Sequence, residues 1–223
     1  VGQYVQVRSL GAWYRRVTSG GMIGPASTVV AVLDFDVMPD DGVYPVTAFG
    51  AKGDNVTDDS VAIRRAIQVL NLMFYTGLGT NIFHQTATLD FGNGRYRLNT
   101  FANSTDDPIR ILCNIKHSGA AIVVTPSYNG IVFIVGKEGA VAGIGECVML
   151  ARYDLPDLYK PTGSAINVGS VGYRMANCNK CFVRFGRVSY FERGIHFGGK
   201  GEGFVYCEVH LGNHNYCRVP ISL

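Results

Sequence analysis

The stretch "VTAFGAKGDNVTDDSVAIRRAIQVL", residues 46–70, poses the question that decides the fold. It places Asp54, Asp58 and Asp59, three of only 17 acidic residues, directly before an apolar pattern with helical spacing. Short oxygen-bearing side chains at the start of a helix bond its free N–H groups, and negative charge suits the positive end of the helix dipole. We therefore interpret Thr57 or Asp58 as the cap of a helix.

The predicted helix covers about residues 58–74 and is amphipathic. Ile63, Ile67, Leu70 and Phe74 recur at helical spacing, and polar side chains occupy the other face. A helix of this kind must lie on an apolar surface. Clustered carboxylates also suit a calcium ion. Their spacing does not follow a calcium loop, so capping is the preferred interpretation and calcium the alternative.

The sequence on either side of this helix predicts strands. Residues 43–49 form a short expected strand, after which Gly50 and Gly53 allow sharp bends. Beyond Gly79 the chain consists of short apolar runs separated by Gly, Asn and Pro, which is typical of a dense series of strands. These runs are "TATLDFGNGRYRLN", "PIRILCNI", "AAIVVT", "GIVFIVG", "SAINVG", "CFVRFG", "RGIHFGG" and "GFVYCEVHLG".

Two weak internal repeats indicate how these strands are arranged. "CFVRFG" is answered by "GFVYCE", which aligns Val183 with Val205, and "SAINVG" is answered by "RGIHFG", which aligns Ile166 with Ile195. Both offsets fall in the range of solenoid repeats, roughly 20 to 45 residues. The roughly 150 residues after the helix then suffice for about five or six rungs.

A coil of parallel strands also explains the helix. The first rung of such a coil exposes apolar interior and unpaired backbone groups, and an amphipathic helix laid over that end covers both. The sequence therefore predicts a mainly β protein: a parallel β-helix over residues 41–223 with an N-terminal capping helix. Residues 1–40, with strand-forming aromatics around Trp13, predict a small preceding β element or linker.

Composition excludes several classes of function. The chain of 223 residues is 47% hydrophobic and 17% charged, which is typical of a globular protein. A net charge of +3 without a run of Lys or Arg argues against a nucleic-acid partner. No apolar stretch reaches the roughly 18 residues of a membrane span, so membrane insertion is not expected.

Six cysteines are too few for a disulfide scaffold, so we expect free, buried thiols and folding in a reducing cytoplasm. Cys178 and Cys181 form a C-x-x-C pair, and His210 and His214 form an H-x3-H pair, which together allow a zinc site. The stretch between the pairs is about twice as long as in a zinc finger. We therefore expect no metal and no cofactor.

Two stretches carry a resemblance to a known family. "VTAFGAKGDNVTDDSVAIRRAI" and "TLDFGNGRYRLN" resemble the opening segment of the pectate-lyase-like superfamily of right-handed parallel β-helices, in the version found in bacteriophage tailspikes and tail fibres. The matching residues are Phe49-Gly50-Ala51, Gly53-Asp54, Thr57-Asp58-Asp59, Ala62-Ile63 and Gly94-Arg95-Tyr96. "GAWYRRV", residues 11–17, resembles the small β element that often precedes this segment. The chain departs from the pattern at "FGNG", where relatives usually carry a proline.

The resemblance implies a function but supplies no catalytic group. It implies a tailspike or tail-fibre component in the virion tail that is made in the host cytoplasm, acts at the host cell surface and recognises bacterial surface polysaccharide. The resemblance leaves open whether the chain also depolymerises this polysaccharide, by a glycoside hydrolase or a polysaccharide lyase mechanism. Its implied partners are other phage tail proteins, and a homotrimer would cover the last strand unless more chain follows. The alternatives are a non-enzymatic structural tail or adhesin module and a free-standing polysaccharide lyase.

The last predicted strands supply the candidate site. Hydrolysis of a glycosidic bond uses two carboxylates that face each other across a groove, and a lyase uses a base beside a uronate. In "FVYCEVHL", strict alternation predicts an outward stripe of Phe204, Tyr206, Glu208 and His210. The inward residues are then Val205, Cys207, Val209 and Leu211.

If the first repeat is one rung, Arg184 lies beside Tyr206, with Tyr190 and Glu192 on a neighbouring turn. The candidate residues are therefore Glu208 and Glu192 for catalysis, and Arg184, Tyr190, Tyr206 and His210 for carbohydrate binding. An ordinary solvent-facing strand is the alternative interpretation. Asp154 and Asp157, in the predicted loop "RYDLPDLYKPTG", could overhang the same groove. The sequence shows no partner for His84, His117 or His196.

Overall fold

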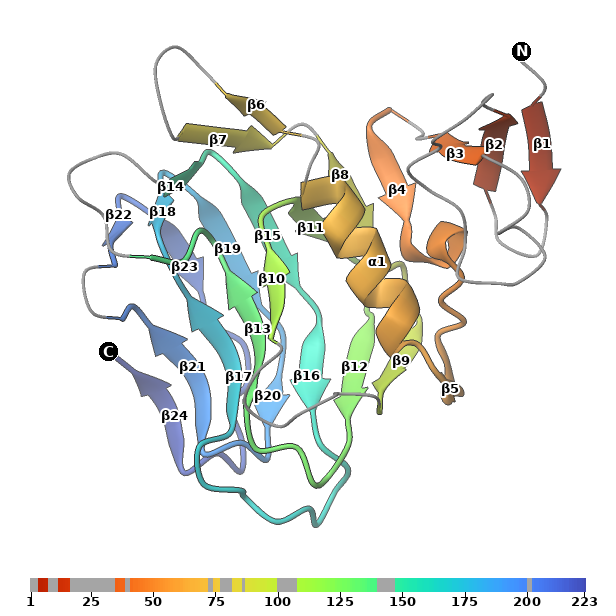
Figure 1. The fold of residues 1–223 in the computed structure, drawn as a ribbon. Helices are drawn as coiled ribbons and strands as arrows, with labels where there is room; N and C mark the ends of the chain where they lie inside the picture. Colours follow the sequence, from red (N-terminus) through yellow and green to blue (C-terminus); the bar gives the residue numbers. More distant parts are fainter. Residues whose placement is uncertain are drawn as a thin grey trace.

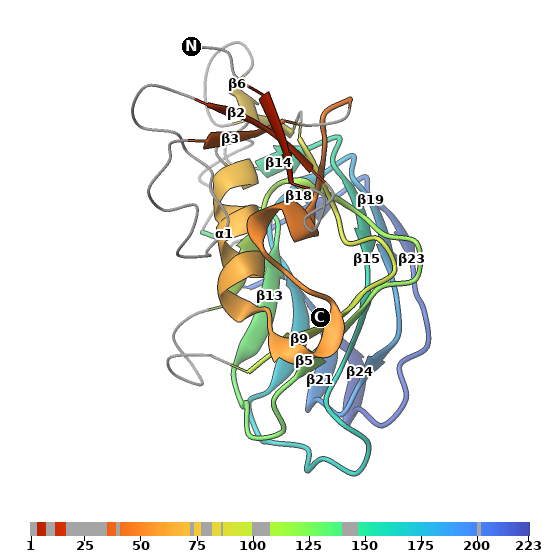
Figure 2. The same cartoon turned by 90° about the vertical axis from the view of Figure 1, so that its right-hand side faces the viewer.

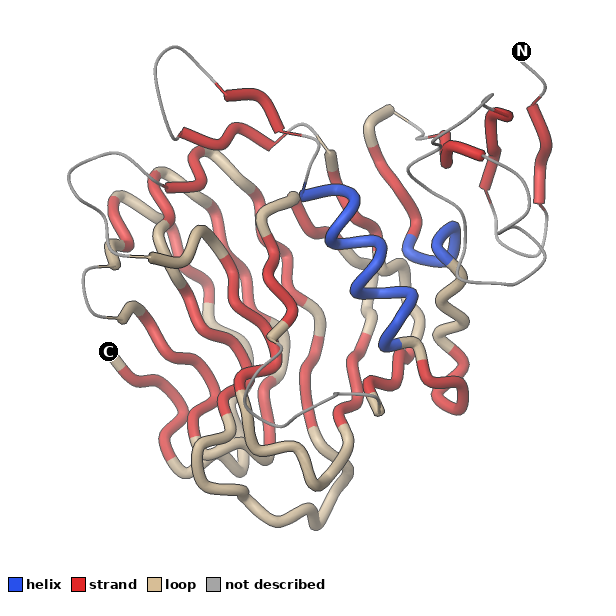
Figure 3. The backbone as a smooth tube through the Cα atoms, in the orientation of Figure 1, coloured by secondary structure: helices blue, strands red, loops and turns tan. Residues whose placement is uncertain are grey.

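The structure is a computed structural model, and its described part is mainly β with one α-helix (Figures 1 and 3). It describes residues 4–7, 12–16, 35–38, 41–71, 74–76, 82–85, 87–99, 108–139, 147–199 and 202–223. The first three strands form a small antiparallel sheet in the order β1-β2-β3. They are β1 (Tyr4–Val7), β2 (Ala12–Arg16) and β3 (Phe35–Met38).

The remaining strands form four further sheets, which we number I to IV. Sheet I contains β10 (Ile109–Ile111), β13 (Ile131–Val135), β17 (Val171–Met175), β21 (Arg193–Phe197) and β24 (Val219–Ser222). Sheet II contains β4 (Val43–Pro45), β8 (Thr88–Asp90), β11 (Asn114–Lys116), β15 (Arg152–Leu155), β19 (Phe182–Phe185) and β23 (Glu208–His210).

Sheet III contains β5 (Asp54–Asp58), β9 (Arg95–Leu98), β12 (Ala121–Val124), β16 (Asp157–Tyr159) and β20 (Val188–Ser189). Sheet IV contains β6 (Phe74–Thr76), β7 (Ile82–Gln85), β14 (Cys147–Met149), β18 (Cys178–Asn179) and β22 (Phe204–Val205).

The chain visits these sheets in turn and so forms a coil. β14, β15, β16 and β17 follow one another in sequence and belong to sheets IV, II, III and I, and the next four strands repeat this order one step along. Within the four sheets every strand pair is parallel except β6 with β7. The predicted parallel β-helix is therefore confirmed (Figure 1).

Alternation along each strand fills the interior of the coil. In sheet II, Leu89, Ile115, Tyr153 and Val183 pair in register from strand to strand, and each is at most 1% exposed. Their neighbours on each strand point to the other face, because successive side chains of a strand alternate. Sheet II thus presents an apolar row to the core and polar rows to solvent.

The single long helix covers one end of the coil, as predicted. α1 (Ser60–Asn71) packs against the 3₁₀-helix η2 (Val46–Phe49), β8 and β10. Its residues Ile63, Ile67 and Leu70 are fully buried in the same core as the strands. Burial of each such side chain contributes about 1.5–3 kcal/mol. Figure 2 looks onto this end, with α1 and η2 in front of the coil.

The helix is shorter than the predicted residues 58–74. Asp58 accepts a hydrogen bond from the N–H of Ser60 (3.1 Å), so its predicted contribution to the first turn is confirmed. Phe74 was placed on the helix wrongly and lies in β6. The last helical residue is Asn71, whose side-chain amide donates to the carbonyl of Arg110 (2.7 Å) and accepts from the N–H of Leu112 (2.8 Å). These bonds fix the last turn of the helix against sheet I.

The other two aspartates of the opening stretch also bind backbone N–H groups. Asp54 accepts from the N–H of Val56 (2.9 Å) and of Thr57 (2.7 Å), and these bonds lower its pKa to about 2. Asp59 is buried and accepts from the N–H of Lys52 (2.6 Å) and of Gly53 (3.2 Å). The crowding of carboxylates therefore holds the first turn of the coil together.

The two stretches of sequence that open the coil, residues 46–67 and 88–99, meet in space around Tyr96. Its ring lies so close to Gly53 and Gly94 that a Cβ at either position would fall 2.9 Å or 2.6 Å from it. Gly53 also has a φ of +61°, which glycine adopts without strain. The Tyr96 hydroxyl donates to the carbonyl of Phe91 (2.7 Å). The spacing of the motif thus reflects one tyrosine packed between two glycines of adjacent coils.

Two predicted strands differ from the structure. Residues 43–49 are extended only as far as Pro45, and the chain then continues as η2 and turns at Gly50, whose φ is +99°. The stretch "SAINVG", residues 164–169, contains no strand, and the sheet I strand of this coil is β17, which follows it. Its Gly169 has a φ of +86°, so the backbone turns there before the strand begins.

The two internal repeats in the sequence predicted the wrong strand partners, although the prediction that each coil contains several strands is confirmed. Val183 pairs with Val209 and not with Val205. Ile195 pairs with Tyr173 and not with Ile166. The loops between strands differ in length from coil to coil, so no single offset relates one coil to the next.

All six cysteines are free, which confirms that prediction, and four of them are buried. Burial raises the pKa of Cys113 to about 12, so this thiol stays protonated at neutral pH. Among the helices that the structure describes, none combines the length and apolar character needed to cross a bilayer.

Candidate ligand-binding site

The outer face of sheet II gathers polar and aromatic side chains in two rows. The register places Arg152, Phe182 and Glu208 in the first row and Asp154, Arg184 and His210 in the second. Three of the predicted site residues, Arg184, Glu208 and His210, therefore lie on one face. The register puts Arg184 beside His210, however, and not beside Tyr206 as the internal repeat predicted.

A groove of about 400 Å³ follows this face across the stacked strands. It is lined by Val43, Thr88, Asn114, Ile115, Lys116, Leu150, Arg152, Asp154, Phe182 and Arg184. These residues come from five neighbouring strands of sheet II and from the corner before β15, so a ligand that lies along the coil can contact several rungs at once.

The floor of the groove is organised around Asp154. Arg184 donates two hydrogen bonds to its carboxylate (2.7 and 2.5 Å), and this pairing raises the pKa of Arg184. His117 reaches the same carboxylate through Nε2 at 3.4 Å. Its Nδ1 accepts from the N–H groups of Gly119 and Ala120, so the proton of the neutral ring lies on Nε2. His117 has no visible partner in the sequence, and the fold supplies one.

Arg152 is held differently. Its guanidinium stacks on the ring of Phe182, 4.8 Å from the ring centroid, and the His210 ring lies 5.1 Å from the same ring. Within the described part of the chain, no carboxylate pairs with Arg152. By contrast, its neighbour Lys116 lies 3.2 Å from Asp90. Arg152 is thus an exposed, positioned cation with free N–H donors.

Glu208 and Tyr206 lie at the edge of the same face. Glu208 is exposed and lies 2.6 Å from Nε2 of His210. Tyr206 is 84% exposed and has a φ of +54°. It follows Leu150 and Lys180, which also have positive φ, in the stack of corners between sheets IV and II. The side chain of Tyr206 therefore projects from a corner and not from a strand face.

The other two predicted residues lie at a different corner of the coil, between sheets III and I. The Tyr190 ring stacks on Tyr216, with centroids 5.2 Å apart and planes at 4°. Glu192 accepts from the N–H of Gly169 (2.6 Å) and pairs with Arg218 (3.3 Å). Glu192 therefore does not face Glu208, and the two do not form a pair across one groove.

The alternation predicted for "FVYCEVHL" fails at the corner. The positive φ of Tyr206 interrupts the strand, so β22 and β23 are separate strands in different sheets. Phe204, predicted to point outward, packs against the core, whereas Val205 is 44% and Leu211 is 49% exposed. Only Cys207 and Val209 face inward as predicted.

Asp154 and Asp157 are likewise strand residues, although we predicted a loop around them. Pro156 occupies the corner between β15 and β16, so this proline marks a turn between two strands. Asp157 accepts from the N–H of Arg187 (2.6 Å) and helps to join β16 to the next coil.

The zinc alternative finds no support in the described residues, where no three His, Cys, Asp or Glu side chains gather to hold a metal ion. Cys178 and Cys181 lie inside the coil, whereas His210 lies on its outer face beside Glu208. Of the two other histidines for which the sequence shows no partner, the structure describes a partner for one. His196 bonds the hydroxyl of Ser222 (2.9 Å), and the side chain of His84 lies outside the described residues.

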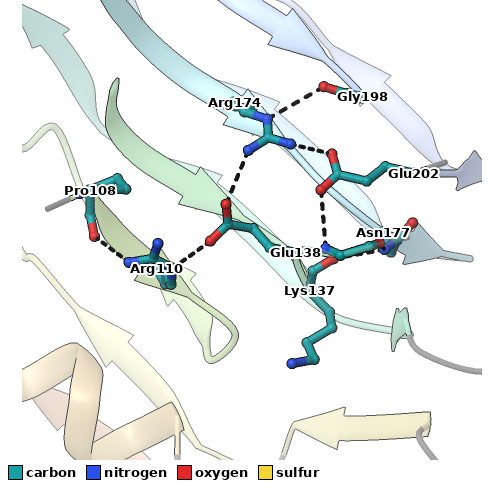
Figure 4. Close-up of polar contacts among 9 residues, drawn as sticks. Pro108, Arg110, Lys137, Glu138, Arg174, Asn177, Gly198 and Glu202 are labelled. Atoms are coloured by element: carbon teal, nitrogen blue, oxygen red, sulfur yellow. Dashed lines mark hydrogen bonds and ion pairs between the residues drawn. The ribbon is translucent and has the colours of Figure 1, made fainter. Parts of the chain in front are cut away.

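Sheet I carries a second group of charges on its outside, Arg110, Glu138, Arg174 and Glu202, which pair with one another. Arg174 bonds Glu138 (3.0 Å) and Glu202 (2.6 Å), and Glu138 also pairs with Arg110 (Figure 4). The side chain of Glu202 is only 4% exposed. Its other oxygen accepts from the N–H of Gly139 at 3.2 Å. This network joins loops of successive coils, and each of its two arginines is bonded to a carboxylate.

Sequence reasoning missed Arg152, Phe182 and His117 as members of the site. Their juxtaposition depends on coils of unequal length, because the in-register partners Ile115, Tyr153, Val183 and Val209 of sheet II are unevenly spaced along the chain. No repeat in the sequence displays this spacing. No protein-family profile matches the chain, and no curated protein matches it.

Proposed function

We propose that this chain recognises bacterial surface polysaccharide through the groove on sheet II, as a component of a phage tailspike or tail fibre. The fold-level support is the resemblance of residues 46–67 and 88–99 to the opening segment of tailspike β-helices. The resemblance specifies a scaffold, and the function must come from the site.

The observation that carries the proposal is the groove itself. It combines stacked outward rows of Arg, Asp, Asn and Lys with an aromatic ring, across five neighbouring strands. Carbohydrate sites use this combination, because hydroxyl groups need polar partners and the apolar face of a sugar ring packs on an aromatic side chain. A long groove also suits a polymer better than a small ligand.

Recognition without cleavage is the form of this proposal that the geometry favours. Glycoside hydrolysis uses carboxylates about 5–10 Å apart on either side of the bond. Glu208 and Glu192 lie on different sides of the coil, and Asp154 is bonded to Arg184 and His117. The alternative of a non-enzymatic adhesin or structural tail module therefore gains weight. Assembly as a homotrimer with other tail proteins remains part of the proposal.

Binding and cleavage are separated by one experiment. The chain is incubated with capsular polysaccharides and lipopolysaccharides from a panel of bacteria, and both retention on immobilised glycan and release of reducing ends are measured. We expect retention by at least one glycan with no new reducing ends. Absence of retention across the panel contradicts the proposal.

If reducing ends do appear, Glu208→Gln decides the role of that residue. A sharp loss of turnover assigns catalysis to Glu208, and unchanged turnover removes it from the candidates. Glu192→Gln serves as the companion variant from the other corner of the coil.

A further inference from the structure

The charges in the sheet II groove differ in how far they reach into solvent. Among the lining residues, Lys116, Arg152 and Arg184 are cations and Asp154 is the single carboxylate. The side chains of Lys116 and Arg184 are 47% and 56% exposed, whereas that of Asp154 is 21% exposed. A ligand that enters the groove therefore meets positive charge first.

Arg152 is the member of this set with unused binding capacity. Lys116 pairs with Asp90, and Arg184 donates two hydrogen bonds to Asp154. The Arg152 guanidinium stacks on an aromatic face and has no hydrogen-bond or ion-pair partner among the described residues. Arg152 is exposed, so the planar fork of N–H donors is open to solvent. Such a fork matches the two oxygens of a carboxylate or phosphate.

Phe182 holds this fork in place. The ring stacks under the guanidinium from the neighbouring strand, and the imidazole of His210 packs beside the same ring. Stacking restricts the long arginine side chain and so reduces the entropy lost when an anion binds. The arrangement is therefore prepared for a ligand before one arrives.

We propose that the groove selects an anionic polysaccharide and that Arg152 binds the acidic group of one sugar residue. This inference rests on the proposed function and narrows its substrate class. Phe182 acts as a positioning residue for Arg152, and Lys116 and Arg184 add longer-range attraction at the two ends of the subsite.

The test uses the same panel of bacterial polysaccharides, each in three forms: native, with its carboxylates reduced to alcohols by carbodiimide and borohydride, and dephosphorylated. We expect binding to native acidic polymers and loss of binding in one of the treated forms, which identifies carboxylate or phosphate as the source of the charge. Equal affinity for native and treated polymers, or binding only to neutral polymers, overturns the inference while leaving polysaccharide recognition intact. No binding to any polymer overturns both.

Substitutions assign the charge to Arg152. Arg152→Gln is expected to weaken binding by roughly 10- to 100-fold, the range for losing a charge-assisted hydrogen-bonded pair. Arg193→Gln, which removes an exposed arginine at the start of β21 on sheet I, is the matched control and leaves affinity unchanged. Arg152→Lys retains charge without the fork and restores only part of the affinity. Wild-type affinity in Arg152→Gln contradicts the assignment, with far-UV circular dichroism confirming that each variant is folded.

Discussion

The first turn of the coil and the outer face of sheet II use their polar side chains in opposite ways. In the first turn, Asp59 bonds the N–H groups of Lys52 and Gly53, and Asp58 bonds Ser60, so each carboxylate serves the fold. On sheet II, Arg152 faces solvent without a carboxylate partner in the described structure. The comparison teaches that the recognisable motif specifies the scaffold and that binding capacity lies where no motif is visible.

The largest expected effect concerns the helix that covers the first turn. Ile67→Ala removes a fully buried side chain from the interface between α1 and the coil, and we expect the free energy of unfolding to fall by about 2–5 kcal/mol. Val61→Ala on the exposed face of the same helix is the control, with a change below about 0.5 kcal/mol. Urea unfolding followed by circular dichroism measures both. Equal effects of the two substitutions would show that α1 does not stabilise the protein by covering the end of the coil.

A second pair of variants compares paired arginines on the two outer faces. Arg174→Met leaves the nearly buried carboxylate of Glu202 without its cation, and we expect a loss of about 3 kcal/mol. Arg184→Met breaks an exposed pair with Asp154 and costs below about 1 kcal/mol. The same urea experiment applies. A larger loss for Arg184→Met than for Arg174→Met would contradict the division into structural and ligand-facing charges.

A third prediction is a pH dependence of stability from a cation inside the coil. Lys160 is fully buried, donates to the carbonyl of Tyr128 (2.5 Å) and lies over the Phe191 ring, and burial lowers its pKa from the ordinary 10.5 to about 8. Between these values the unfolded chain binds more protons than the folded one, so raising the pH stabilises the fold.

Lys160→Met removes this contribution, while Asn167 still donates to the Tyr128 carbonyl. The free energy of unfolding of the wild type relative to Lys160→Met is therefore expected to rise from pH 8 to pH 10 and to be constant below about pH 7. Other groups that titrate in this range are common to both proteins and cancel. A difference that does not vary with pH would show that Lys160 keeps its ordinary pKa.

The sequence predicts the fold far better than the site, for a physical reason. Periodicity and turn residues act locally, so α1, the strands and the bends at Gly50 and Gly53 could be inferred from neighbouring residues. The position of α1 over the end of the coil could also be inferred, because an amphipathic helix that precedes a series of strands has one apolar surface on which to pack.

The site depends on register between coils, which is not local. The stretch of chain that brings Arg152 beside Phe182 is longer than the one that brings Phe182 beside Glu208, because the loops in each coil have no fixed size. The positive φ of Tyr206 also interrupts the chain between β22 and β23, whereas side-chain alternation alone had predicted one continuous strand there. Glu208, Arg184 and His210 were grouped correctly because they belong to adjacent strands, whereas Tyr190 and Glu192 lie around a corner.

The most direct test of the division between scaffold and ligand face is to follow the arginine Nε–Hε resonances of the ¹⁵N-labelled chain while an acidic surface polysaccharide that it retains is added. We predict that the Arg152 resonance shifts with saturation and that the Arg174 resonance does not, because Arg174 is already bonded to two carboxylates. A shift at Arg174, or an Arg152 resonance that stays in place at saturating polysaccharide, would contradict the account.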